Sequence, residues 1–109
     1  MANTFKNAFK TATDAYQTLY VTPHSPSTTT VVLGLALCNK SASAVTVTVQ
    51  IQDAGSTAYQ VLEQVSIPAR TTLEVLAGQK YILMETDTLR ILAGTTGQID
   101  ATLGIMEIT

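Results

Sequence analysis

The segment Ala44–Gln52, AVTVTVQIQ, constrains the fold more than any other part of the sequence. Valine or isoleucine occupies positions 45, 47, 49 and 51, and threonine or glutamine occupies the positions between them. This period-two pattern is typical of a strand that buries one face. The chain holds 19 threonines, many beside Val, Ile or Leu, and these also favour sheet because β-branched side chains pack well on a pleated surface.

Further strands are predicted where apolar or alternating runs stand between turn residues. Thr30–Cys38 is almost continuously apolar, which predicts a strand that is central or covered on both faces. The polar segment 39–43 after it predicts an antiparallel hairpin with the strand of residues 44–52. In the last strand, Gly104 predicts a bulge and the apolar positions change step at Met106. The remaining predicted strands are Tyr16–Thr22, Ala58–Ile67, Thr71–Leu76, Tyr81–Met84, Thr88–Leu92 and Gln98–Ile108, with turns at 53–56, 77–79, 85–87 and 94–97.

Seven to nine short strands in 109 residues predict one all-β domain, a two-sheet antiparallel β-sandwich. Its strand order is expected to be either jelly-roll or immunoglobulin-like, because local patterns do not specify long-range pairing. We expect residues 1–13 to form an N-terminal arm and residues 14–109 to form the sandwich. The spacing of Phe5, Ala8, Phe9 and Ala12 fits both a short helix and an extended strand, so both remain open for the arm.

Charged residues make up only 13% of the chain, about half the usual quarter of a soluble domain. Such a surface is either covered by other protein or kept polar by uncharged Thr and Ser. A sandwich also has edge strands that must be covered, charged or paired. We therefore expect a homo-oligomer, with an arm that reaches a neighbouring copy. The candidate assembly-interface residues are Phe5, Phe9, Tyr16 and Tyr20.

The sequence offers no recognisable catalytic, cofactor or metal-binding chemistry. The single histidine, His24, lies in a proline-flanked loop without a cluster of ligands around it, and Cys38 lies alone in an apolar run. Glu85 and Asp87 are close enough to share Ca²⁺, but no EF-hand spacing supports this and we expect a solvated turn. Six scattered cations and a net charge of −2 argue against nucleic-acid binding, and no segment approaches the ~20 apolar residues of a membrane span. We expect a protein that is not an enzyme.

The chain contains five local patterns: FKNA at 5–8, YVTP at 20–23, NKS at 39–41, the segment IPARTTLEV at 67–75, and ETDTL at 85–89. Together they resemble small β-sandwich structural proteins of tailed-bacteriophage virions, in which glycine is common at the position of Thr86. The resemblance implies a capsid decoration or cement protein, or else a component of the neck, tail or baseplate. It implies other virion proteins as partners, namely the major capsid protein or tail and neck proteins, and location in the virion after synthesis in the host cytoplasm.

A second hypothesis, that the chain is a binding module and not a structural protein, stays open. The loops at residues 22–29 and 93–98 are candidate binding sites of a stand-alone module for carbohydrate or peptide, because binding residues often lie on loops held by a rigid scaffold. Such a module would be monomeric and would bind a small ligand saturably.

Overall fold

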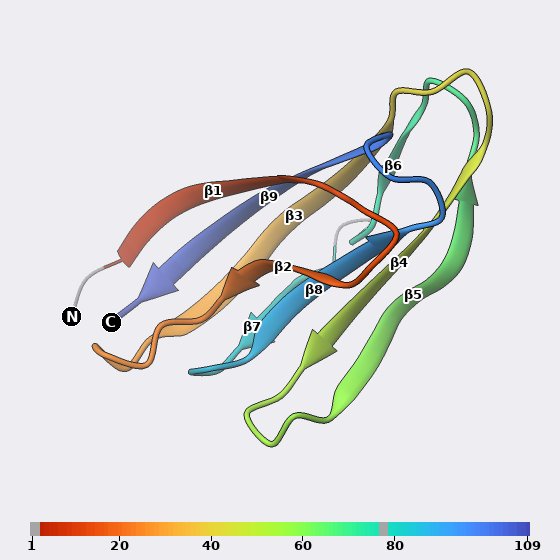
Figure 1. The fold of residues 1–109 in the computed structure, drawn as a ribbon. Helices are drawn as coiled ribbons and strands as arrows, with labels where there is room; N and C mark the ends of the chain where they lie inside the picture. Colours follow the sequence, from red (N-terminus) through yellow and green to blue (C-terminus); the bar gives the residue numbers. More distant parts are fainter. Residues whose placement is uncertain (1–2, 77–78) are drawn as a thin grey trace.

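The computed structural model describes residues 3–76 and 79–109, and this part of the chain forms nine strands and no helix (Figure 1). The predicted all-β fold is confirmed. The predicted turn at 77–79 falls partly on residues outside the described part. The strands are β1 (Asn3–Thr11), β2 (Gln17–Val21), β3 (Thr29–Asn39), β4 (Val45–Gln52), β5 (Ala58–Ile67), β6 (Thr72–Glu74), β7 (Tyr81–Leu83), β8 (Thr88–Ala93) and β9 (Ile99–Ile108).

The strands form two sheets packed face to face. Sheet A has the order β1-β9-β3-β6, with β7 also paired to β3, and sheet B has the order β2-β8-β4-β5. Every pair is antiparallel, and the pairing is symmetric about the β4–β5 turn: β4 with β5, β3 with β6 and β7, β2 with β8, and β1 with β9. The chain is thus one long hairpin rolled into a sandwich, which is the jelly-roll order and not the immunoglobulin-like one.

The predicted hairpin between β3 and β4 is wrong, because β3 lies in sheet A and β4 in sheet B. The buried Asn39 side chain turns the segment between them into a corner. Its Nδ2 donates hydrogen bonds to the carbonyl oxygens of Ser43 and Ile67, both at 2.9 Å, and its Oδ1 accepts from the Ser41 N–H at 2.9 Å. A polar segment of this length marks a change of direction but does not specify which sheet the next strand joins.

The core lies between the sheets and follows the period-two pattern of the sequence. Val45, Val47 and Val49 of β4 are at most 4% exposed, and β3 lies centrally in sheet A, as predicted. In β9 the inward alternation continues without a break through Glu107, so the predicted change of step at Met106 is wrong. Gly104 does lie at a bulge, but the additional residue is Leu33 on the partner strand.

The segment expected to be an arm is a strand over residues 3–11, which decides between the two conformations that the sequence allowed. β1 pairs with β9 along its whole length, from Asn3 opposite Ile108 to Thr11 opposite Asp100. It therefore forms one edge of sheet A (Figure 1), and eight of its nine residues are exposed.

Candidate assembly interface

A row of apolar side chains crosses the outer face of sheet A. Phe5 on β1 lies opposite Met106 on β9, Met106 lies opposite Val31 on β3, and Val31 lies opposite Ile82 on β7. Phe5 is 72% exposed and Ile82 is 54% exposed. The bulge residue Leu33 and, beyond the end of β7, Met84 add two more exposed apolar side chains. Cross-strand neighbours lie about 4.5–5.5 Å apart, so the four residues of this row form a continuous apolar surface.

The outer face of sheet A becomes more polar towards the other end of β1. Phe9, which is 69% exposed, borders a depression of ≈ 380 Å³ whose lining also includes Thr11 and Asp100. The Asp100 carboxylate accepts a hydrogen bond from Thr11 Oγ1 at 2.8 Å and pairs with Lys40 Nζ at 3.2 Å. The carboxylate beside the depression is thus already paired, and the rest of the lining combines the Phe9 ring with the polar side chains of Lys10 and Thr102.

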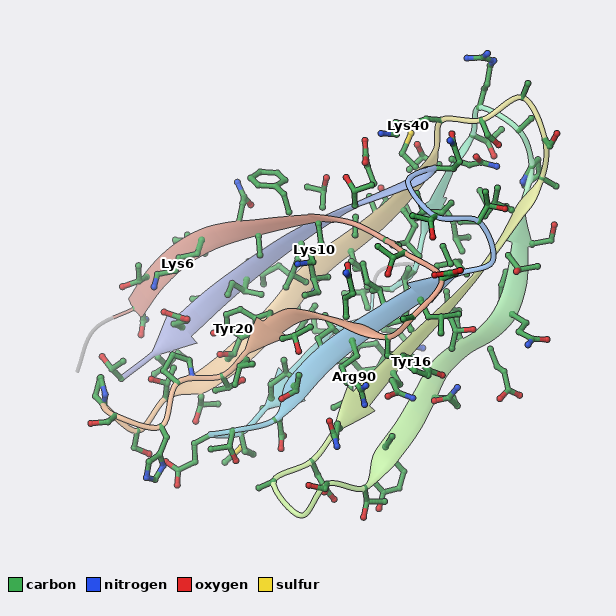
Figure 2. The ribbon with its side chains drawn as sticks, viewed as in Figure 1. Lys6, Lys10, Tyr16, Tyr20, Lys40 and Arg90 are labelled. Carbon is green, nitrogen blue, oxygen red and sulfur yellow. The ribbon has the colours of Figure 1, made fainter. Side chains whose placement is uncertain are left out.

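The outer face of sheet B has the opposite character. The corresponding row across it is Thr18, Arg90, Gln50 and Gln60. Arg90 Nη1 donates to Gln50 Oε1 at 3.0 Å, and Gln50 Nε2 donates to Gln60 Oε1 at 2.8 Å. The Arg90 guanidinium also stacks over the Tyr16 ring at 4.9 Å from its centroid (Figure 2). The row is thus polar and internally hydrogen-bonded, although Gln50 at its centre is only 5% exposed.

The four predicted interface residues therefore lie in three places. Phe5 and Phe9 share the outer face of sheet A, whereas Tyr16 lies against Arg90 of sheet B. Tyr20 is half-buried, and its hydroxyl bonds to Glu107 and to Thr30 Oγ1 inside the sandwich. The structure places the two phenylalanines on the same face, four residues apart along β1, and keeps the tyrosines away from that face.

Sequence reasoning missed the rest of the apolar row, namely Val31, Ile82 and Met106. Each of these residues lies beside a buried neighbour in an apolar strand, so its type does not distinguish it from core. Only the pairing of β9 and β7 with β3 aligns them with Phe5. The one local signal was Met106, which is out of phase with the alternation of Ile99 to Ile105, but this was interpreted as a change of step and not as an outward-facing side chain.

A polar cluster closes the end of the sandwich beneath β1. The Glu107 side chain is only 8% exposed, and its carboxylate pairs with Lys6 Nζ at 2.9 Å and accepts a hydrogen bond from the Tyr20 hydroxyl. Burial alone would raise the Glu107 pKa, but the hydrogen bonds from Tyr20 and Lys6 outweigh it and hold that pKa below its ordinary value. Burial and the carboxylate together raise the pKa of Tyr20 to about 12.

Other candidate chemistry is sparse in the described residues. Among them no group of three or more His, Cys, Asp or Glu side chains is placed to hold a metal ion. His24 Nδ1 lies 3.4 Å from a Glu85 carboxylate oxygen at the surface, and a hydrogen bond from Ser27 lowers the pKa of Glu85. Cys38 is a half-buried free thiol. The residues covered by the structure include no helix long and apolar enough to cross a membrane.

Fold and surface together define the class: a small jelly-roll β-sandwich with one apolar and one polar outer face. No protein-family model and no curated protein matches the chain. Solved structures do match it. A chain of the acid-stable capsid of Helicobacter pylori bacteriophage KHP30 is similar over 100% of this chain and 89% of its own, with 9% identity and a TM-score of 0.58.

Two further structures of similar length share the fold. A subunit of the disulfide-linked pili that form Bacillus endospore appendages matches over 97% of this chain and 84% of its own, with 15% identity and a TM-score of 0.56. The Drosophila NLP core, described with pentamer formation and histone binding, matches over 96% and 98%, with 15% identity and a TM-score of 0.52. Identities this low establish the jelly-roll fold alone. All three are proteins of larger assemblies: a shell, a fibre and a pentamer.

Proposed function

We propose that this chain is a non-enzymatic structural protein of a bacteriophage virion, and specifically a capsid decoration protein that docks on the shell through the outer face of sheet A. The observation that carries the proposal is the contrast between the two outer faces. The row from Phe5 to Ile82 leaves apolar area exposed, whereas the row from Thr18 to Gln60 is hydrogen-bonded and polar. Exposed apolar patches on soluble domains mark interaction sites.

The residues of this chain separate the three kinds of assembly that share its fold. A disulfide-linked fibre needs at least two cysteines in each subunit, and Cys38 is the only cysteine in these 109 residues. Binding to basic histones calls for an acidic surface, but eight acidic residues against six Lys and Arg leave a net charge of only −2. A virion shell requires neither feature. It requires a compact subunit with an apolar docking face, which favours the phage assembly.

The surface also favours docking over ligand binding. The Asp100 carboxylate beside the depression at Phe9 is already paired with Lys40 and Thr11. Lys10 is the other charged side chain of the lining, so the depression has few groups that could orient a carbohydrate or peptide. A role in the neck, tail or baseplate would use the same apolar face, so copy number and position distinguish it from decoration.

The experiment is to locate the protein in particles. Virions produced from the genome that encodes the chain are purified on a density gradient, and the protein is quantified against the major capsid protein by mass spectrometry and labelled with immunogold. Decoration predicts a copy number comparable to the shell subunit and label over the whole shell. Label confined to one vertex or to the tail would assign a neck, tail or baseplate role. Absence from purified particles would refute a virion role.

A further inference from the structure

The free edge of β1 is a second surface, distinct from the outer face of sheet A. The Ala12 N–H donates to the Ile99 carbonyl oxygen at 2.8 Å, and the register that places Thr11 opposite Asp100 places these two residues opposite each other. Hydrogen-bonded and non-hydrogen-bonded pairs alternate along an antiparallel ladder. The even-numbered residues of β1 therefore bond to β9, and the odd-numbered ones, from Asn3 to Thr11, direct their N–H and C=O groups outward.

This edge lacks most of the features that keep edge strands from pairing. It has nine residues, contains no proline, and pairs with β9 without a register shift. Of its two lysines, Lys6 is partly neutralised by its ion pair with Glu107. The other edges are shorter or interrupted: β6 and β7 have three residues each, β2 has a register shift, and β5 contains Gln64 at φ 49°. Among the described edge strands, β1 therefore has the longest free edge that no register shift interrupts.

We propose that β1 pairs antiparallel with β1 of a second copy of this chain, about a two-fold axis at Asn7. This register gives the full overlap of residues 3–11. It places Phe5 opposite Phe9 of the partner subunit on the outer face, twice by symmetry, and aromatic cross-strand pairs stabilise sheets. It also pairs outward-directed residues with outward-directed residues, so about ten inter-chain hydrogen bonds form without disturbing β9.

The lysines select the same register. With the axis at Asn7, Lys6 lies opposite Ala8 of the partner subunit and Lys10 lies opposite Thr4 of the partner subunit. The two neighbouring registers that keep outward residues paired would place Lys6 opposite either Lys6 or Lys10 of the partner subunit. Like charges directly opposite each other destabilise a strand pair, so the register with the longest overlap also avoids charge repulsion.

Dimerisation would join the two A sheets into one continuous sheet. Because the two-fold axis runs perpendicular to the sheet, the outer faces of both copies point the same way. The two rows from Phe5 to Ile82 then lie on one side, which doubles the apolar docking area. Only the partner of this joint apolar face, the capsid shell, rests on the proposed function. The pairing of β1 with β1 rests on the backbone register.

The axis at Asn7 gives a test specific to this register, because Asn7 is exposed and faces itself across the dimer. The purified wild-type chain is expected to dimerise in sedimentation equilibrium at low ionic strength. N7K and N7E should each weaken the dimer about five-fold through like-charge repulsion. A one-to-one mixture of the two should form heterodimers beyond random pairing, as counted by native mass spectrometry. The matched controls T72K and T72E, on the exposed edge strand β6, should dimerise as the wild type does.

If the dimer is too weak to detect at equilibrium, a disulfide across the proposed interface can trap it. In a Cys38→Ser background, Asn7→Cys places two thiols in a directly opposed pair, with Cα atoms about 5.5 Å apart, within the range of a disulfide. Oxidation should give a cross-linked dimer, whereas Thr11→Cys in the same background should not, because residue 11 faces residue 3. A wild-type monomer that N7C fails to trap, or N7K and N7E chains that dimerise like the wild type, would overturn the proposal. Neither readout involves capsids, so its failure is distinct from a failure to decorate shells.

Discussion

At the scale of single residues, Glu107 couples the fold to pH. The hydrogen bonds from Tyr20 and Lys6 lower its pKa in the folded state relative to the unfolded chain, where a glutamate titrates near its ordinary value of about 4.3. A depressed folded pKa contributes stability that is fully present above the unfolded pKa and is lost as pH falls through the folded pKa. We predict that the free energy of unfolding declines as the pH falls below about 5. Glu107→Gln should be less stable at pH 7 and should lose less on acidification, as measured by urea titration at several pH values. Equal acid sensitivity of both proteins would contradict this role.

Tyr20 gives the complementary prediction at alkaline pH. Its pKa is raised to about 12, because burial and the Glu107 carboxylate both disfavour the phenolate. A raised folded pKa contributes stability that is fully present below the unfolded value of about 10 and is lost as pH rises towards the folded value. Ultraviolet absorbance titration should find one of the four tyrosines ionising near pH 12, together with the onset of unfolding. In Tyr20→Phe the late step should be absent. Three tyrosines and a late step in that variant would assign the shift to another residue.

Thr86 occupies a backbone conformation that favours glycine. Its φ is 68°, in the left-handed region where a Cβ atom costs about 1–2 kcal/mol. The sequence indicated this position by resemblance, since glycine is common there in the phage proteins. Thr86→Gly is expected to stabilise the chain by about 1 kcal/mol, which raises Tm by roughly 4–8 °C for a domain of this size. The control Thr88→Gly, in the extended strand β8, should lower Tm, measured by differential scanning calorimetry. A fall in Tm for both variants would mean that the Thr86 side chain makes compensating contacts.

At the scale of strands, the docking face can be changed without changing the fold. Ile82→Lys places a charge at the exposed end of the apolar row on sheet A. The free energy of unfolding should change by less than about 0.5 kcal/mol, as at most surface positions. Rebinding to stripped capsids should fall at least ten-fold, measured by co-sedimentation. Ser66→Lys, on the exposed edge strand β5 of sheet B, is the matched control and should rebind normally. Equal losses for both variants would place the docking surface elsewhere.

Most strands were predictable because the period-two pattern is local, and strand pairing was less so because it is not. Ala58–Ile67 was predicted with its observed bounds, and the predicted buried face of β4 matched Val45, Val47 and Val49, although Thr48 and Gln50 on its other face are buried as well. The β3–β4 hairpin failed because the hydrogen bonds of Asn39 reach Ile67, which is 28 residues away. The candidate interface was likewise predictable only where the signal is local. The aromatic character of Phe5 and Phe9 is visible in the sequence, whereas Ile82 joins them only through two intervening strands.

At the scale of the whole molecule, β1 is separable from the core. Of the described β1 side chains only Ala8 packs against the core, and even that residue is partly exposed, whereas Ala12, just beyond the strand, is fully buried. A deletion that removes residues 2–10 and keeps Ala12, with its hydrogen bond to Ile99, should therefore leave the sandwich folded. The deletion also removes Lys6, so the same truncation is made with Glu107→Gln to spare an unpaired carboxylate.

We predict that both truncated chains keep a β-sheet circular dichroism spectrum and a cooperative thermal transition at a lower Tm, because the β9 ladder loses one partner. Both should sediment as monomers at concentrations where the full chain dimerises, since the edge centred on Asn7 is gone. A truncated chain that dimerises as the full chain does would assign self-association to another edge. Unfolding of the Glu107→Gln truncation would mean that β1, despite its exposure, is needed to hold β9 in sheet A. A folded monomer would mean that β1 serves self-association, whereas an unfolded chain would mean that β1 is needed for the fold.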